Sequence, residues 1–250
     1  MPHRWRRSAS TSSSAVAGQR SDRDAGALAR RDRARGAAGG SVGLLSSRPM
    51  AFARMYSIRS RAAKALVLTI RSASGRYRVA ENPEEMQCVV ALAFGYRRAG
   101  VAREPGPCNE YLAALTLATS NGRPIIAQAE IDQAIRSCRP GVGAAQIIGP
   151  TLNSERYFDT RECAVQAHSI MSDSGWKTAA LIAHPHHLPR VQAVFASYGI
   201  ETATPPDIRA IWDRESNQPW TRGPLRWAIR ELFAIWLYER RGWLRLSYLK

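Results

Sequence analysis

The chain has 250 residues, of which 45% are hydrophobic, and a formal net charge of +16. This length accommodates one well-buried domain and leaves no clear room for a second core. A high positive charge suggests a nucleic-acid or membrane partner. However, Lys and Arg outnumber Asp and Glu by 14 within residues 1–80, which leaves only +2 for residues 81–250. Residues 81–250 are therefore nearly neutral, which argues against nucleic acid as their partner.

The cysteines indicate a reducing compartment. Four of them, Cys88, Cys108, Cys138 and Cys163, are widely spaced and form no C-x-x-C pair, unlike a disulfide-rich scaffold. The first 20 residues are rich in Ser and Ala and lack the apolar core of a secretory signal. No later apolar run approaches the roughly 20 residues of a transmembrane helix. We therefore expect a cytoplasmic protein without a transmembrane segment.

Residues 1–60 are dominated by Arg, Ala, Ser and Gly without apolar periodicity, so a disordered basic extension is expected there. One interpretation is an arm that binds nucleic acid or anionic lipid. The other is an extension without a function, which precedes a true initiator methionine at Met50, Met55 or Met86. Aromatic residues for base stacking are not interleaved, which favours the second interpretation. Residues 61–85 are expected to form a linker or a peripheral segment.

Residues 86–250 alternate short apolar runs with helical patterns, which predicts an α/β domain. The expected fold is a Rossmann-like three-layer domain with a mainly parallel sheet of about five strands. Its strands are predicted within residues 87–95, 123–128, 144–149, 177–184 and 200–204, and its helices within residues 111–122, 130–138, 155–175 and 188–199.

The C-terminal segment, residues 225–250, predicts an amphipathic helix rich in tryptophan. Such a helix can lie on a membrane surface, so peripheral membrane contact stays open. The favoured alternative is that Trp227, Trp236 and Trp243 pack against the sheet domain and close it.

Ligands of open parallel sheets bind beyond the carboxyl ends of the strands, so four loops are candidates: residues 95–110, 128–130, 149–162 and 184–190. The last reads HPHHLPR. Arg190 could grip a phosphate or carboxylate with two hydrogen bonds, and His187 could transfer a proton near neutral pH. Alternatively, these residues could be structural. Zinc is disfavoured because histidines so close in a turn seldom converge on one ion.

The segment DTREC opens the preceding helix, where Thr160 and Glu162 could point into the same crevice. Asp159 and Glu162 also have the spacing of a capping box, which would make Glu162 structural. His168 shares a helical stripe with Ala164 and Met171, so it is expected in the core and outside the site.

These motifs resemble a known family. The D-T-R-E-C-A segment, the H-x-x-R of His187 and Arg190, the following G-I-E strand and the late Gly242-Trp243-Leu244 are similar to the ElyC/SanA/YdcF family, the YdcF-like domain of unknown function 218. The resemblance covers roughly residues 86–245 and implies a Rossmann-like fold, with a loose association with bacterial envelope biogenesis. Two departures are visible. Gln128-Ala129-Glu130 stands where members often carry a glycine-rich turn, and the N-terminal membrane anchor of envelope members is not seen.

The leading hypothesis is binding of an anionic small molecule, nucleotide-like or phosphorylated. The expected ligand-binding residues are Gly95, Asn109, Gln128, Glu130, Thr160, Glu162, His187 and Arg190. If there is catalysis, His187 is the candidate acid or base, Arg190 the group that stabilises charge, and Glu162 the group that orients one of these two. The cofactor stays open, with a nucleotide-type ligand such as S-adenosylmethionine among the candidates, and no metal is expected. The alternative function is a non-catalytic interaction protein that uses its aromatic C-terminal helix. The sequence does not fix the oligomeric state.

Overall fold

The computed structural model describes residues 48–79, 82–100, 102–150 and 158–244. At its centre is a sheet of five parallel strands: β1 (Cys88–Ala91), β4 (Ile125–Gln128), β5 (Gln146–Ile148), β6 (Thr178–Ile182) and β7 (Glu201–Ala203). Their order is β5-β4-β1-β6-β7, which is the order of a doubly wound Rossmann-type sheet. The predicted fold class is therefore confirmed.

The strands form where short apolar runs can be buried on both faces of the sheet. Strand β1 is wholly buried and lies between β4 and β6. Consecutive residues such as Val89 and Val90 thus face opposite layers of the core. Each fully buried aliphatic side chain of this kind stabilises the fold by about 1.5–3 kcal/mol.

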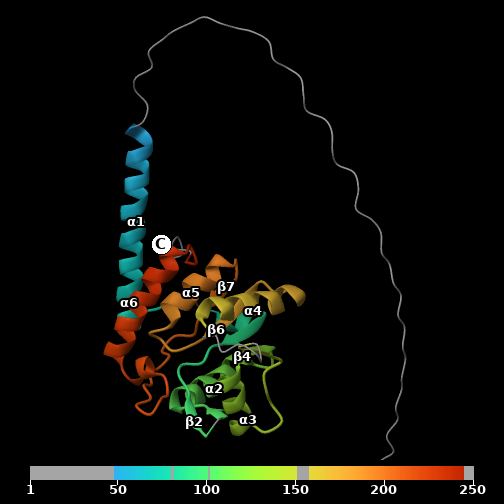
Figure 1. The fold of residues 1–250 in the computed structure, drawn as a ribbon. Helices are drawn as coiled ribbons and strands as arrows, with labels where there is room; N and C mark the ends of the chain where they lie inside the picture. Colours follow the sequence, from blue (N-terminus) through green and yellow to red (C-terminus); the bar gives the residue numbers. More distant parts are fainter. Residues whose placement is uncertain (1–47, 80–81, 101, 151–157, 245–250) are drawn as a thin grey trace, which may run out of the picture. The chain divides into compact units, whose positions relative to one another are not determined.

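Four helices cover the two faces of the sheet: α2 (Pro107–Ser120), α3 (Ala129–Cys138), α4 (Thr160–Asp173) and α5 (Leu188–Ser197). Helices α2 and α3 pack together on one face, and α4 and α5 pack together on the other (Figure 1). Helix α4 begins at Thr160, later than expected, because Asp159 caps it by accepting a hydrogen bond from the N–H of Glu162. Residues 155–157 of the expected helix lie outside the described residues.

Two further helices, α1 (Arg48–Ser74) and α6 (Pro224–Arg240), pack against each other, and α1 also contacts α5. Helix α6 was predicted, whereas α1 was not. Helix α6 ends at Arg240, earlier than expected, and residues 245–250 lie outside the described residues. Trp227 is buried as expected, but the packing expected of Trp236 is wrong, because its side chain is 47% exposed. The expected boundary at residue 60 falls inside α1, and residues 61–74 are helical where a linker or peripheral segment was expected. Buried Leu68 of α1 shares a small apolar cluster with Ile235 of α6, which accounts for the helix as part of the fold. Residues 1–47 lie outside the described residues.

The segment between β1 and α2 also differs from the expected loop, because it contains an antiparallel hairpin of β2 (Arg97–Ala99) and β3 (Ala102–Glu104). Arg97 holds the hairpin by a two-point ion pair with buried Asp213, both contacts at 2.8 Å. This ion pair ties the hairpin to residues that follow β7. The hairpin therefore stands at a fixed place beside the carboxyl end of β1.

Candidate functional site

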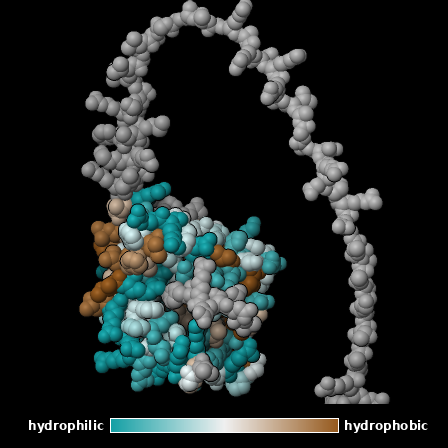
Figure 2. Space-filling model, in the orientation of Figure 1, coloured by the Kyte–Doolittle hydropathy of each residue, from teal (hydrophilic) through white to brown (hydrophobic). Residues whose placement is uncertain are grey.

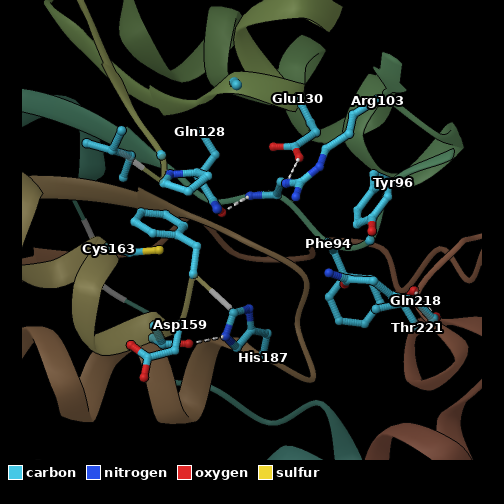
Figure 3. A pocket seen from close by; sticks show the side chains of 18 of the residues that line it. Phe94, Tyr96, Arg103, Gln128, Glu130, Asp159, Cys163, His187, Gln218 and Thr221 are labelled. Carbon is cyan, nitrogen blue, oxygen red and sulfur yellow. Dashed lines mark hydrogen bonds and ion pairs between the residues drawn. The ribbon is translucent and has the colours of Figure 1, made fainter. Parts of the chain in front are cut away.

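A cavity of about 1160 Å³ opens at the carboxyl ends of the strands (Figure 3). Residues following β1, β4, β5 and β6 all contribute to its wall, and residues 217–230 close another side. In a doubly wound sheet this edge is the expected ligand site. Here the neighbouring strands are β1 and β6, and the chain leaves β1 towards β4 but leaves β6 towards β7 on the other side. The position predicted from the sequence is thus where the structure has its cavity.

Amide side chains fix the backbone around the cavity. Gln128 Oε1 accepts a 2.7 Å hydrogen bond from the N–H of Ala93. Gln166 of α4 both accepts from the N–H and donates to the carbonyl of Gly149, which follows β5. These bonds satisfy backbone groups that the end of a strand leaves open, and they hold the rim of the cavity without using a charge.

Asn109 performs the same task for the turn after β1. Its side chain is completely buried, accepts from the N–H of Phe94 and donates to the carbonyl of Gly95, both at 2.8 Å. Gly95 has φ +76°, and a Cβ there would meet the hydroxyl oxygens of Thr221 and Ser216 at 2.6 and 2.7 Å. The turn thus requires glycine for its backbone angle and for its close contact with the chain before α6.

Thr160, His187 and Arg190 form a hydrogen-bonded group at the cavity wall. The hydroxyl of Thr160 lies 3.0 Å from His187 Nε2 and accepts a 2.6 Å bond from Arg190 Nη1. All three side chains are at least nine-tenths buried and line the cavity. His187 Nδ1 is buried and has no hydrogen-bond partner in the part of the chain that the structure describes. It is the polar atom of this group that a bound molecule could satisfy.

Arg190 continues this network away from the cavity. Its Nε donates a 2.8 Å bond to Oε1 of Glu231 on α6, and the two side chains are 2% and 1% exposed. Ser72 of α1 donates a longer bond, 3.5 Å, to the same oxygen. The guanidinium is thus already paired in the fold, which agrees with the structural alternative left open by the sequence, although the sequence did not identify Glu231 as the partner of Arg190.

Burial sets the protonation of the cavity wall. It lowers the pKa of His187 well below the ordinary value of histidine, and the nearby charges of Arg190 and Arg230 lower this pKa further. His187 is therefore a neutral imidazole at neutral pH. Cys163 also lines the cavity, but burial raises its pKa well above that of a free thiol. Its thiol is protonated and is a poor nucleophile.

We expect the free energy of unfolding to fall as the pH is lowered from about 7 towards 5, by up to about 1.4 kcal/mol per pH unit for each buried histidine. Burial lowers the pKa of both His184 and His187 in the folded protein. The unfolded chain, with ordinary pKa values near 6.5, binds protons in this range that the folded protein does not. The stability that the neutral forms of His184 and His187 contribute is therefore fully present above about pH 6.5 and is lost progressively as the pH falls below it.

Urea unfolding at several pH values measures this dependence, and His187→Gln is the matched variant because its amide can still bond to Thr160. In His187→Gln, the slope of the free energy of unfolding against pH should be smaller than in the wild type by the contribution of one histidine, up to about 1.4 kcal/mol per pH unit. An unchanged slope would mean that His187 titrates normally in the folded protein.

The remaining wall carries exposed charge and aromatic rings. Arg103 of the hairpin lies over the ring of Tyr96 and contacts Glu130 at 3.4 Å, with its side chain 49% exposed (Figure 3). Across residues 220–230, the Arg230 guanidinium lies 5.3 Å from the ring centre of Trp220 and 5.6 Å from that of Trp227. Such a wall combines cationic donors with flat apolar surfaces.

The structure brings together most of the residues that the sequence singled out. Those that line the cavity are Gly95, Gln128, Glu130, Thr160, His187 and Arg190. Two expected ligand contacts lie elsewhere. The side chain of Asn109 bonds to the backbone of Phe94 and Gly95 and does not line the cavity. Glu162 also does not line it, and its N–H donates to the side chain of Asp159 in the cap of α4. The side chains that contact the group directly are Thr160, which bonds to both His187 and Arg190, and Glu231, which bonds to Arg190.

One expectation about the other histidines is wrong. His168 is exposed on α4 instead of buried in the core. His184 is buried and stacks on Phe94, with ring centres 3.8 Å apart and planes 8° apart. Among the described residues, no three His, Cys, Asp or Glu side chains are placed to hold a metal ion.

Several wall residues were missed by the sequence analysis. Arg103 lay in a segment interpreted as a loop, and residues 205–224 show neither strand nor helix periodicity. Trp227 and Arg230 of α6, and Trp220 shortly before it, line the cavity, and the ion pair of Arg190 with Glu231 holds α6 beside α5. The interleaving of Trp and Arg in residues 220–230 is the one local signal that could have indicated them.

Comparisons of the chain with protein-family models, with curated proteins and with solved structures found no match. No helix within the described residues is both long and apolar enough to cross a membrane.

Proposed function

We propose that the domain binds a small anionic molecule, phosphorylated or nucleotide-like, in the cavity at the carboxyl end of the sheet. The observation that carries this proposal is the wall itself, which combines the guanidiniums of Arg98, Arg103 and Arg230 with the rings of Tyr96, Trp220 and Trp227. Guanidiniums grip phosphate or carboxylate, and the partly exposed rings of Tyr96 and Trp220 can accept a planar ring. S-adenosylmethionine stays among the candidate ligands, and nucleic acid is not proposed.

Arg103 takes the role that the sequence analysis gave to Arg190. The Arg190 guanidinium is held by Glu231 and Thr160 inside the fold, whereas Arg103 is half exposed and its contact with Glu130 is long, 3.4 Å. A ligand phosphate can therefore displace Glu130 from Arg103 at low cost. His187, neutral and with Nδ1 unpaired, is the group placed to bond to the ligand or exchange a proton with it.

The proposal extends to the family. We infer a YdcF-like domain in the cytoplasm, and two observations support this. Thr160, His187 and Arg190, which carry the resemblance, meet at one cavity wall, and none of the four cysteines is paired. The apolar outer face of α6 favours the second candidate function, interaction through the C-terminal helix.

A thermal-shift screen of nucleoside phosphates and S-adenosylmethionine tests the proposal. A ligand at 100 times its dissociation constant should raise the stability by about 2.7 kcal/mol. Arg103→Ala should weaken its binding about tenfold or more, since a hydrogen bond to a charged group contributes about 1.5–3 kcal/mol. Arg214→Ala, an exposed arginine outside the cavity, is the matched control and should bind normally. Equal loss in both variants, or no shift with any ligand, would contradict an anion site at this wall.

A further inference from the structure

Helix α6 has apolar residues on the face that it turns to solvent. The exposed ones are Leu225, Ile229, Leu232, Phe233 and Trp236, with exposures from 47% to 73%. Their spacing of i, i+4, i+7, i+8 and i+11 places them in one stripe. The opposite stripe, Trp227, Glu231, Ala234, Ile235 and Tyr238, is buried. The buried stripe alone anchors α6 to the domain, and the large apolar side chains of the outer stripe are left in contact with solvent.

Helix α1 repeats this pattern beside it. Leu66, Val67 and Ile70 are 59%, 41% and 57% exposed, whereas Leu68 and Ser72 on the other side are fully buried. Because α1 and α6 pack together, the two stripes belong to one surface, which we call the α1/α6 apolar face. Figure 2 shows hydrophobic side chains gathered over these helices at the left of the view. Contiguous apolar surface of this kind marks an interaction site.

Basic side chains accompany this face. On α6, Arg226 and Arg240 are exposed, and Arg240 lies over the ring of Trp236 at 5.0 Å. On α1, Arg61 is exposed and Lys64 half buried. The acidic residues of α6 are Glu231, which is buried in its ion pair, and Glu239. Apolar and aromatic side chains bordered by arginines are the pattern of helices that lie in a lipid interface.

We propose that the α1/α6 apolar face docks on an anionic lipid surface, with both helices lying along it. The charge favours this occupant over a second copy of the chain, because the exposed Arg61, Arg226 and Arg240 at the border of one face would meet the same cations of the other. Each basic residue near an anionic leaflet adds to the attraction. Trp236 and Phe233 would enter the boundary between head groups and acyl chains, where aromatic residues are favoured.

Co-sedimentation of the full chain with vesicles tests this. We expect binding to vesicles of phosphatidylcholine mixed with phosphatidylglycerol, weaker binding to phosphatidylcholine alone, and a decrease with added salt. The double variant Phe233→Ser/Trp236→Ser keeps every charge and removes two exposed rings, so its partition onto anionic vesicles should fall about tenfold or more. Val165→Ser, an exposed apolar position on α4, is the matched control and should bind like the wild type.

Unchanged melting temperatures of both variants would show that any loss arises at the surface. Binding of the double variant at the wild-type level would overturn the proposal, because the basic residues alone would then account for it. A dimer that is abolished by the same double variant, with no vesicle binding, would also overturn it and would assign the face to a second copy. Neither result depends on the ligand of the cavity.

Discussion

Glu231→Ala is expected to destabilise the domain by about 3–5 kcal/mol, the usual cost of leaving one partner of a buried ion pair without the other. Arg190 and Glu231 are almost completely inaccessible, and their bond of 2.8 Å links α5 to α6. Removing the carboxylate leaves a buried guanidinium with only part of its hydrogen bonding. Few single changes elsewhere in the chain should cost as much.

Two companion variants separate charge from packing. Glu231→Gln keeps an oxygen that can accept from Arg190 Nε, so it should cost less than the alanine variant. The double variant Arg190→Met/Glu231→Leu removes both charges and should recover much of the loss, since apolar replacements of a buried pair are often neutral. Urea unfolding measures all three. A double variant as unstable as Glu231→Ala would show that the lost packing, and not the unpaired charge, is responsible.

Asn109→Ala should destabilise the domain by about 2–6 kcal/mol, because it leaves two buried backbone groups unsatisfied at about 1–3 kcal/mol each. These groups are the N–H of Phe94 and the carbonyl of Gly95, and both bonds run to the one amide at 2.8 Å. The turn after β1 would then lose the support that shapes one wall of the cavity. Ligand affinity should therefore fall together with stability.

Asn217→Ala provides the control for this change. Asn217 also lines the cavity, but its side chain is exposed, and substitutions of exposed residues usually change stability by less than about 0.5 kcal/mol. The comparison uses the free energy of unfolding of both variants in urea. If the two variants were equally stable, the turn after β1 would not depend on the Asn109 amide.

The sheet and the place of the site could be predicted from the sequence because both follow from local patterns. Short apolar runs such as residues 88–91 are long enough for a strand and too short for a helix, and parallel strands are buried on both faces. Once the strands were assigned, their carboxyl ends located Gln128, Thr160 and His187 without any knowledge of contacts.

What each polar residue does at the site could not be predicted in the same way. Asn109 and Gln128 are both amides near strand ends, yet Asn109 is fully buried against backbone while Gln128 still reaches the cavity. The difference arises from how α2 packs, which the local sequence does not encode. The pairing of Arg190 with Glu231 spans 41 residues, and only the packing of α6 on α5 brings the two charges together.

The same pairing makes the order of synthesis matter. Arg190 leaves the ribosome 41 residues before Glu231, so a nascent chain that already holds all five strands still carries an unneutralised cation at the place that its core must close. A fragment that ends before α6 would lack the Glu231 carboxylate that pairs with Arg190. A chain that ends before α6 should therefore be less stable than the full chain, because the Glu231 carboxylate that neutralises buried Arg190 would be missing.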